Sequence, residues 1–186
     1  MLPLFLALPL AASAPPAQSL HYADFVAAAR GADAVAVFEG LPRGQPPAAA
    51  HFNIQDQAFF PPPLDFSARE LAGVDDAVLG HRSNFAPWSG PKFCGGFHAD
   101  RAVVWCQGGQ VRARALFCFG CHEARFIVGS RTEWVDMSDG GYAVLRHLLL
   151  SGPLAYRPVP PQIPPPPHDP IGEPKLPAVP DLQIWP

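Results

Sequence analysis

Residues 102–117 read AVVWCQGGQVRARALF, and they set the fold class of this chain. Two apolar runs flank the sequence Gln-Gly-Gly-Gln at 107–110. Because paired glycines readily adopt the left-handed backbone of a tight turn, the stretch predicts a β-hairpin. In its second half Arg112 and Arg114 alternate with apolar residues, which indicates that one face of that strand begins in solvent.

More strands are expected on both sides of the hairpin. The apolar run 33–38 suits a buried strand, and residues 123–128 and 132–135 are two further β-rich segments. Residues 43–66 are interrupted by proline and glycine, so we expect them to be mostly irregular.

Three segments carry helix signals. Ser19 is a candidate N-cap for a helix that runs to Arg30 and stops at Gly31. The residues expected on its buried face are Leu20, Ala23, Val26 and Ala27.

The second helix is predicted from Ser67, which forms a capping-box pattern with Glu70, to Leu79. Ser138 is expected to cap a third helix that ends at Leu150. Together these elements predict an α+β fold, a small antiparallel β-meander covered by two or three helices.

The two ends of the chain differ from this central part. Residues 1–14, MLPLFLALPLAASA, match the apolar core and small-residue cleavage box of a signal peptide, so we expect export to the periplasm or the extracellular space. The apolar run is shorter than the roughly 20 residues of a membrane-spanning helix. From residue 158 onward 12 of 29 residues are proline, which predicts a disordered tail over 158–186 and leaves 19–157 as a single domain.

Charge and motif content argue against several functional classes. The net charge is -3 and only 16% of the residues are charged, with no stripe of Lys and Arg, so nucleic acid is not an expected partner. The chain has no G-x-S-x-G, P-loop or H-E-x-x-H motif, and no catalytic triad stands out. We therefore expect a binding or structural module rather than an enzyme, with another protein or the cell envelope as its partner.

The sequence CFGCHE at 118–123 carries the most specific chemistry. Gly120 allows a tight turn that would place Cys118 and Cys121 opposite each other at the end of a hairpin, within disulfide range. For an exported protein, a structural disulfide is the first expectation.

A metal site is a second interpretation of the same residues. Cys94 and His98 have a C-x3-H spacing, and Cys118 and Cys121 follow them as a C-x2-C pair. Three thiolates and one imidazole form a set that suits tetrahedral zinc. His122 is a doubtful additional ligand that could replace His98.

Two redox interpretations make the alternative function. C-x-x-C-H is the attachment motif of haem c, with His122 as the iron ligand. Haem is disfavoured because the flanks of the motif are β-like and Met137 is the only nearby methionine for a second axial position. An exchangeable dithiol would place Cys118 at a helix N-terminus, where the helix dipole lowers the thiol pKa, and no strong helix is expected there.

Three segments together resemble an uncharacterised bacterial family whose members carry EGLP, K-x-CGGFHPD and CFGC-(H)-E motifs in that order. The matching residues are 38–43, 92–100 and 118–123, and the resemblance covers residues 20–157. Ala99 stands where the family usually has proline.

The family has no activity that could be carried over to this chain. The resemblance implies that four residues form one site or one covalent staple, with Cys106 outside it. These residues are Cys94, His98, Cys118 and Cys121.

Overall fold

The computed structural model describes residues 20–43, 51–61 and 63–151, which all belong to the unit Met1–Ala155. The expected signal peptide and the proline-rich tail lie outside the described residues. The helical elements are α1 (Tyr22–Arg30), α2 (Ala68–Asp75), the π-helical turn η1 (Asp76–Gly80), the 3-10 turn η2 (Arg82–Asn84) and α3 (Asp139–Leu150). The strands are β1 (Ala34–Glu39), β2 (Phe52–Ile54), β3 (Gln57–Phe59), β4 (Phe85–Pro87), β5 (Arg101–Gln107), β6 (Gln110–Cys118), β7 (Glu123–Val128) and β8 (Arg131–Met137).

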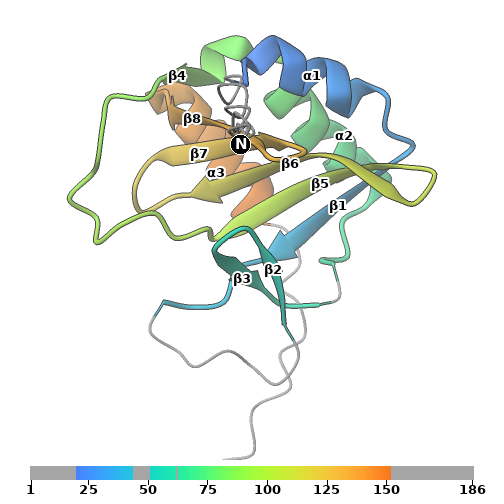
Figure 1. Ribbon diagram of the computed structural model, residues 1–186, viewed down its shortest axis with the longest axis horizontal. Coiled ribbons are helices and arrows are strands. Elements are labelled where there is room, and N and C mark those ends of the chain that lie inside the picture. Colours follow the sequence, from blue (N-terminus) through green and yellow to red (C-terminus); the bar gives the residue numbers. More distant parts are fainter. Residues whose placement is uncertain (1–19, 44–50, 62, 152–186) are drawn as a thin grey trace, which may run out of the picture. The chain divides into compact units, whose positions relative to one another are not determined.

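The main sheet has six strands in the order β1-β5-β6-β7-β8-β4, and every neighbouring pair is antiparallel (Figure 1). Strands β5 to β8 follow one another as a meander. β2 and β3 form a separate two-stranded sheet. The prediction of an α+β fold built on an antiparallel meander is confirmed.

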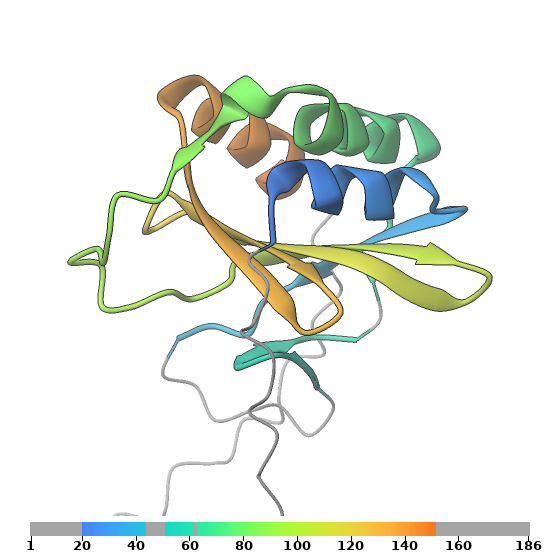
Figure 2. The same ribbon diagram turned by 45° about the horizontal axis from the view of Figure 1, so that its top comes forward.

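The main sheet separates two apolar cores. On one face, alternate strand residues such as Phe117 and Phe126 pack against α1, α2 and α3. On the other face, Leu116 and Ile127 pack against residues of the β2–β3 hairpin. Figure 2 shows the three helices on one side of the sheet and the hairpin on the other. We call the side that carries the hairpin the open face, because none of the described helices covers it.

The first helix begins later than expected. Its N-cap is His21 instead of Ser19, which lies outside the described residues, and it ends at Arg30 with Gly31 as its C-cap, as predicted. The buried residues of α1 are Phe25, Val26 and Ala29, whereas Ala23 and Ala27, expected on that face, are exposed. The Phe25 ring stacks on Phe126 at a centroid distance of 4.4 Å. Because this ring has more apolar area to bury than the alanine side chains of the helix, it fixes the rotation of the helix.

The other local predictions agree well with the structure. Ser67 and Glu70 form a complete capping box, and the Ser138 hydroxyl accepts from the Gly141 amide at the start of α3. Gly108 and Gly109 have φ values of 56° and 78° and connect β5 to β6, as the Gln-Gly-Gly-Gln sequence predicts.

Two elements were missed. Residues 43–66 were expected to be mostly irregular, yet they contain the β2–β3 hairpin, whose strands have three residues each. The hairpin is stable in this position because its tip is anchored on the main sheet: Asp56 binds Arg125, and Gln55 donates to Thr132 over 2.7 Å. The short edge strand β4 gave no sequence signal either, since it has only three residues.

Gly40 lies where three segments meet. It follows β1, donates from its amide to the Asp100 carbonyl over 3.0 Å, and forms an isolated bridge with Phe59 of β3. An ideal Cβ at this position would overlap the carbonyl oxygen of Ala99 and lie 3.0 Å from its carbon. The backbones can approach this closely only because residue 40 has no side chain.

We therefore predict that Gly40→Ala lowers the free energy of unfolding by about 3 kcal/mol or more, as a backbone clash does in a packed interior. Gly31→Ala is the matched control, because its Cβ would lie 3.8 Å from the nearest atom. The control should change stability by about 1 kcal/mol or less. Urea denaturation followed by circular dichroism measures both variants, and equal effects would contradict the packing argument.

Candidate functional site

A disulfide joins two of the motifs. Cys94, in the loop between β4 and β5, is bonded to Cys121 in the β6–β7 turn, and their Cα atoms are 5.5 Å apart. The expected pairing of Cys118 with Cys121 is therefore wrong. In the β6–β7 ladder the cross-strand partner of Cys118 is Glu123, because the turn is longer than the two residues that were assumed.

Cys118 and Cys106 are free thiols. Cys118 is only 2% exposed. Burial raises the pKa of its thiol, although hydrogen bonds from the backbone of His98 and of Cys121 act in the opposite direction. The Cys118 thiol therefore lies beside the disulfide loop but is protonated at neutral pH. Cys106 is half-buried in β5, opposite Ala34 of β1.

His98 binds the backbone of the EGLP segment. Its Nε2 donates to the carbonyl oxygen of Leu41 over 2.6 Å, and its Nδ1 lies 3.7 Å from a carboxylate oxygen of Asp100. Among the residues that the structure describes, no group of three His, Cys, Asp or Glu side chains is arranged to hold a metal ion. The expected zinc ligands are thus used otherwise: two in a disulfide and one in a hydrogen bond.

His122 is separate from this cluster. Its ring stacks on Tyr142 of α3 at a centroid distance of 3.8 Å, and its φ is 57°, in the left-handed region. It is the last residue of the turn between β6 and β7. Because Cys121 is bonded to Cys94, it is not available for the second thioether that haem attachment requires.

Arg43 holds the loop that carries Cys94. Its guanidinium donates to the carbonyl oxygens of Cys94, Gly95 and Gly96 over 3.1, 2.6 and 2.7 Å. Gly95 and Gly96 have φ values of 83° and 91°, which few other residues adopt. The glycine pair is thus needed to direct three carbonyl groups at one cation.

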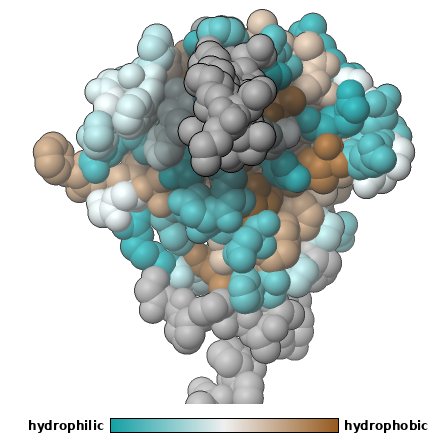
Figure 3. Space-filling view, viewed as in Figure 1, coloured by the Kyte–Doolittle hydropathy of each residue, from teal (hydrophilic) through white to brown (hydrophobic). Residues whose placement is uncertain are grey.

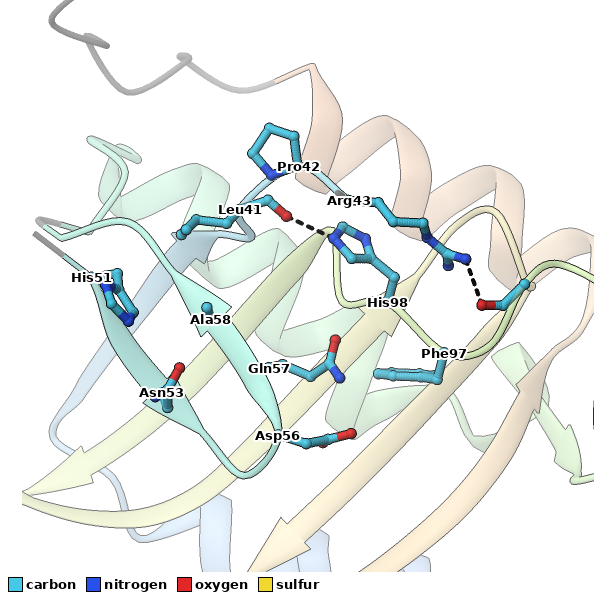
Figure 4. Close-up of a pocket in the computed structure, with 11 residues that line it drawn as sticks. Leu41, Pro42, Arg43, His51, Asn53, Asp56, Gln57, Ala58, Phe97 and His98 are labelled. Atoms are coloured by element: carbon cyan, nitrogen blue, oxygen red, sulfur yellow. Dashed lines mark hydrogen bonds between the residues drawn. The ribbon is translucent and has the colours of Figure 1, made fainter. Parts of the chain in front are cut away.

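An open pocket of about 500 Å³ lies between residues 39–43, which we call the EGLPR segment, the β2–β3 hairpin and the loop that contains Gly95 and His98. In Figure 4, Asp56 and Gln57 extend from the hairpin toward Phe97 and His98. Gln57 is fixed there because its Oε1 accepts from the Ala99 amide over 2.9 Å. Segments that are distant in the sequence therefore meet in a single cavity.

A row of aromatic rings continues from this pocket along the open face. The ring centres of Phe97 and Trp134 are 5.7 Å apart, and those of Trp134 and Trp88 are 5.5 Å apart. The guanidinium of Arg125 lies 3.9 Å from the ring centres of both Phe97 and Trp134, and it also binds Asp56 over 2.8 Å. Arg125 is 7% exposed, while Trp88 and Trp134 are 41% and 38% exposed, so the cation supports the rings from the sheet side.

Two carboxylates hold the loop between β4 and β5 against the sheet. Glu123, which is 3% exposed, accepts from the indole Nε1 of Trp88 over 2.9 Å. Asp136 accepts from the Ser89 amide and from Lys92, each over 3.0 Å. Burial alone would raise the pKa of Asp136, but the hydrogen bonds from Ser89 and Lys92 outweigh it and lower the pKa, so this carboxylate stays charged.

The same loop also presents apolar surface. Phe93, next to Cys94, is fully exposed. In Figure 3 hydrophobic side chains project at the left edge of the molecule, where Figure 1 shows the loop between β4 and β5. Neither the exposed Phe93 nor the aromatic row was expected from the sequence. For the aromatic row, the available sequence signal was Trp134. It precedes the buried Val135 in β8, and neighbouring residues of a strand point to opposite faces of the sheet.

No protein-family model, curated protein or solved structure matches this chain. Among the described helices, none combines the length and the apolar character that crossing a membrane requires.

We predict that the two free thiols differ in their accessibility to an alkylating reagent. Iodoacetamide at pH 7 should modify native Cys106 and leave Cys118 unmodified, because Cys118 is buried and its thiol pKa is raised. Unfolding should expose both thiols, and reduction should expose Cys94 and Cys121 as well. Intact-mass measurement counts the adducts, and peptide mapping identifies the bridge. A native Cys118–Cys121 bridge would contradict the structure.

Proposed function

We propose that this chain is a disulfide-braced binding module whose ligand occupies the pocket between the EGLPR segment, the β2–β3 hairpin and the 94–100 loop. The observation that carries the proposal is the convergence of the motif segments: Leu41, Arg43, Gly95 and His98 all line this pocket. These residues also hold one another in place, through the Leu41–His98 and Arg43–Gly95 hydrogen bonds.

The site is made rigid before any ligand arrives. The loop that forms one wall has no regular secondary structure, yet it is fixed by a disulfide, by the Arg43 guanidinium and by the Lys92–Asp136 ion pair. A loop that is already ordered loses little conformational entropy on binding, which raises affinity. The presence of these cross-links around an open pocket supports a binding role.

Export is part of the proposal. A structural disulfide persists in an oxidising compartment, so the Cys94–Cys121 bridge agrees with the signal-peptide pattern at 1–14. The ligand is then a component of the cell envelope or of the extracellular medium.

The test uses full-length protein labelled with 15N and a library of small polar fragments. Amide shift changes should cluster at pocket-lining residues, and Asn53→Ala should weaken the binding of the best fragment at least tenfold, because this exposed amide lines the pocket. Gln110→Ala removes another exposed amide, at the start of β6 and outside the pocket, and should leave binding unchanged. Shift changes spread over the surface without such a cluster would refute the proposal.

The second candidate is a redox function, and the position of Cys118 favours it. The Cys118 thiolate would attack the sulfur of Cys121, forming a Cys118–Cys121 bond and breaking the bond to Cys94, which leaves as a thiolate. No external oxidant is needed, because one disulfide replaces another. The exchange would release the loop that carries Cys94 from the β6–β7 turn.

This exchange should have a specific pH dependence. Because burial raises the pKa of the Cys118 thiol above its usual value, the thiolate, and with it the rearranged bridge, should appear only in alkaline solution. Acid quenching, alkylation and peptide mapping across pH 7 to 11 measure it, with Cys118→Ser as the inactive control. Absence of the Cys118–Cys121 peptide over this whole range would exclude the redox candidate.

A further inference from the structure

We propose that the ligand of this module is an uncharged carbohydrate chain, which extends from the pocket over the aromatic row of Phe97, Trp134 and Trp88. The inference rests on the proposed binding function and names the chemical class of its ligand. It follows from the shape of the aromatic row, from the polar groups of the pocket and from the way in which both are held.

The aromatic row provides surfaces for the apolar faces of sugar rings. The C–H groups on one face of a pyranose carry partial positive charge, and they lie favourably on the negative face of an aromatic ring. The ring centres of Phe97, Trp134 and Trp88 follow one another at 5.7 and 5.5 Å, a spacing comparable with the advance of one sugar unit along an extended chain. Successive rings are tilted by 65° and 51°, so the row suits a chain whose units rotate stepwise.

The pocket provides planar polar groups for hydroxyls. Asn53 and Gln57 line it with amides, and Gln57 uses its oxygen for the Ala99 amide, so that its NH2 group is the part available to a ligand. Amide and imidazole groups can donate to or accept from a hydroxyl, and a carboxylate can accept from one.

The aspartate and arginine side chains that line the pocket already have polar partners. Asp56 is paired with Arg125, and Arg43 is bound to carbonyl oxygens of the loop. A charged ligand would have to compete with these contacts. An uncharged ligand rich in hydroxyls would leave them intact.

The exposed rings are oriented by buried charged groups. The buried Arg125 supports Phe97 and Trp134, and the buried Glu123 fixes the indole of Trp88. Buried charged side chains are rare unless they are paired, and here each is paired with a group at the surface. Tryptophans that remain over a third exposed while being fixed from beneath are well suited to be binding surfaces.

The proposal is tested with the full chain and three neutral probes, the β-1,4-linked hexamers of glucose, N-acetylglucosamine and xylose. Isothermal titration calorimetry should show binding of at least one hexamer, and tryptophan fluorescence should change on binding because two of the rings are exposed. Trp134→Ala and Trp88→Ala should each weaken binding at least tenfold.

Phe93→Ala is the matched control, because Phe93 is fully exposed on the same loop but is not part of the row. It should leave the affinity within twofold of the wild type. Circular dichroism confirms that each variant is folded. Hexamer binding that survives both tryptophan substitutions would overturn the assignment of the aromatic row.

A further arm separates this inference from the proposed function. If no hexamer binds, while polar fragments still bind the pocket and their binding is lost in Asn53→Ala, the carbohydrate assignment fails and the binding function stands. Binding of a synthetic peptide with the sequence of residues 158–186 at the tryptophan row, in place of the hexamers, would also overturn it, in favour of a proline-rich ligand.

Discussion

The site depends on the close approach of two backbones at Gly40. On one side its amide binds the Asp100 carbonyl, and on the other it bridges to Phe59 of the small hairpin. Once the segments lie at this distance, the carbonyl of Leu41 comes within hydrogen-bond reach of His98. Two residues further along the chain, Arg43 reaches the loop at Gly95. The three walls of the pocket are therefore a consequence of one missing side chain, since a Cβ at residue 40 would separate them.

In the described part of the chain, four buried charged residues are divided between the two faces of the sheet. On the helix side, Glu39 lies 3.7 Å from Arg101, whose Nε donates to the Leu149 carbonyl at the end of α3. A cation at a helix C-terminus satisfies a free carbonyl group and is stabilised by the helix dipole, so this pair has a structural role. On the open face Arg125 and Glu123 bind groups at the surface instead. Buried charged residues thus stabilise the fold on the helix side and hold surface side chains in place on the open face.

The sequence predicts well what depends on local signals and poorly what depends on distant contacts. The Gln-Gly-Gly-Gln turn, the Ser67–Glu70 capping box and the Ser138 cap lie within a few residues of the groups they bind, and the structure confirms them. The β2–β3 hairpin could not be predicted, because its stability comes from contacts of its tip with strands more than 60 residues away. The disulfide was assigned to the wrong pair for the same reason: Cys118 is near Cys121 in sequence, but the loop brings Cys94 to it.

The two proposed functions place opposite demands on the disulfide, and the protonation state of the Cys118 thiol matters to both. A bridge between residues 27 positions apart stabilises the fold by about 3 to 4 kcal/mol in the chain-entropy model, and it keeps the loop with Phe97 on the open face. A redox role needs a ready thiolate beside that bridge, whereas burial raises the pKa of Cys118. At neutral pH the neighbouring thiol is therefore protonated and the bridge is kinetically protected. This is the condition under which a rigid, disulfide-held loop serves recognition, and it favours the binding function over the redox one.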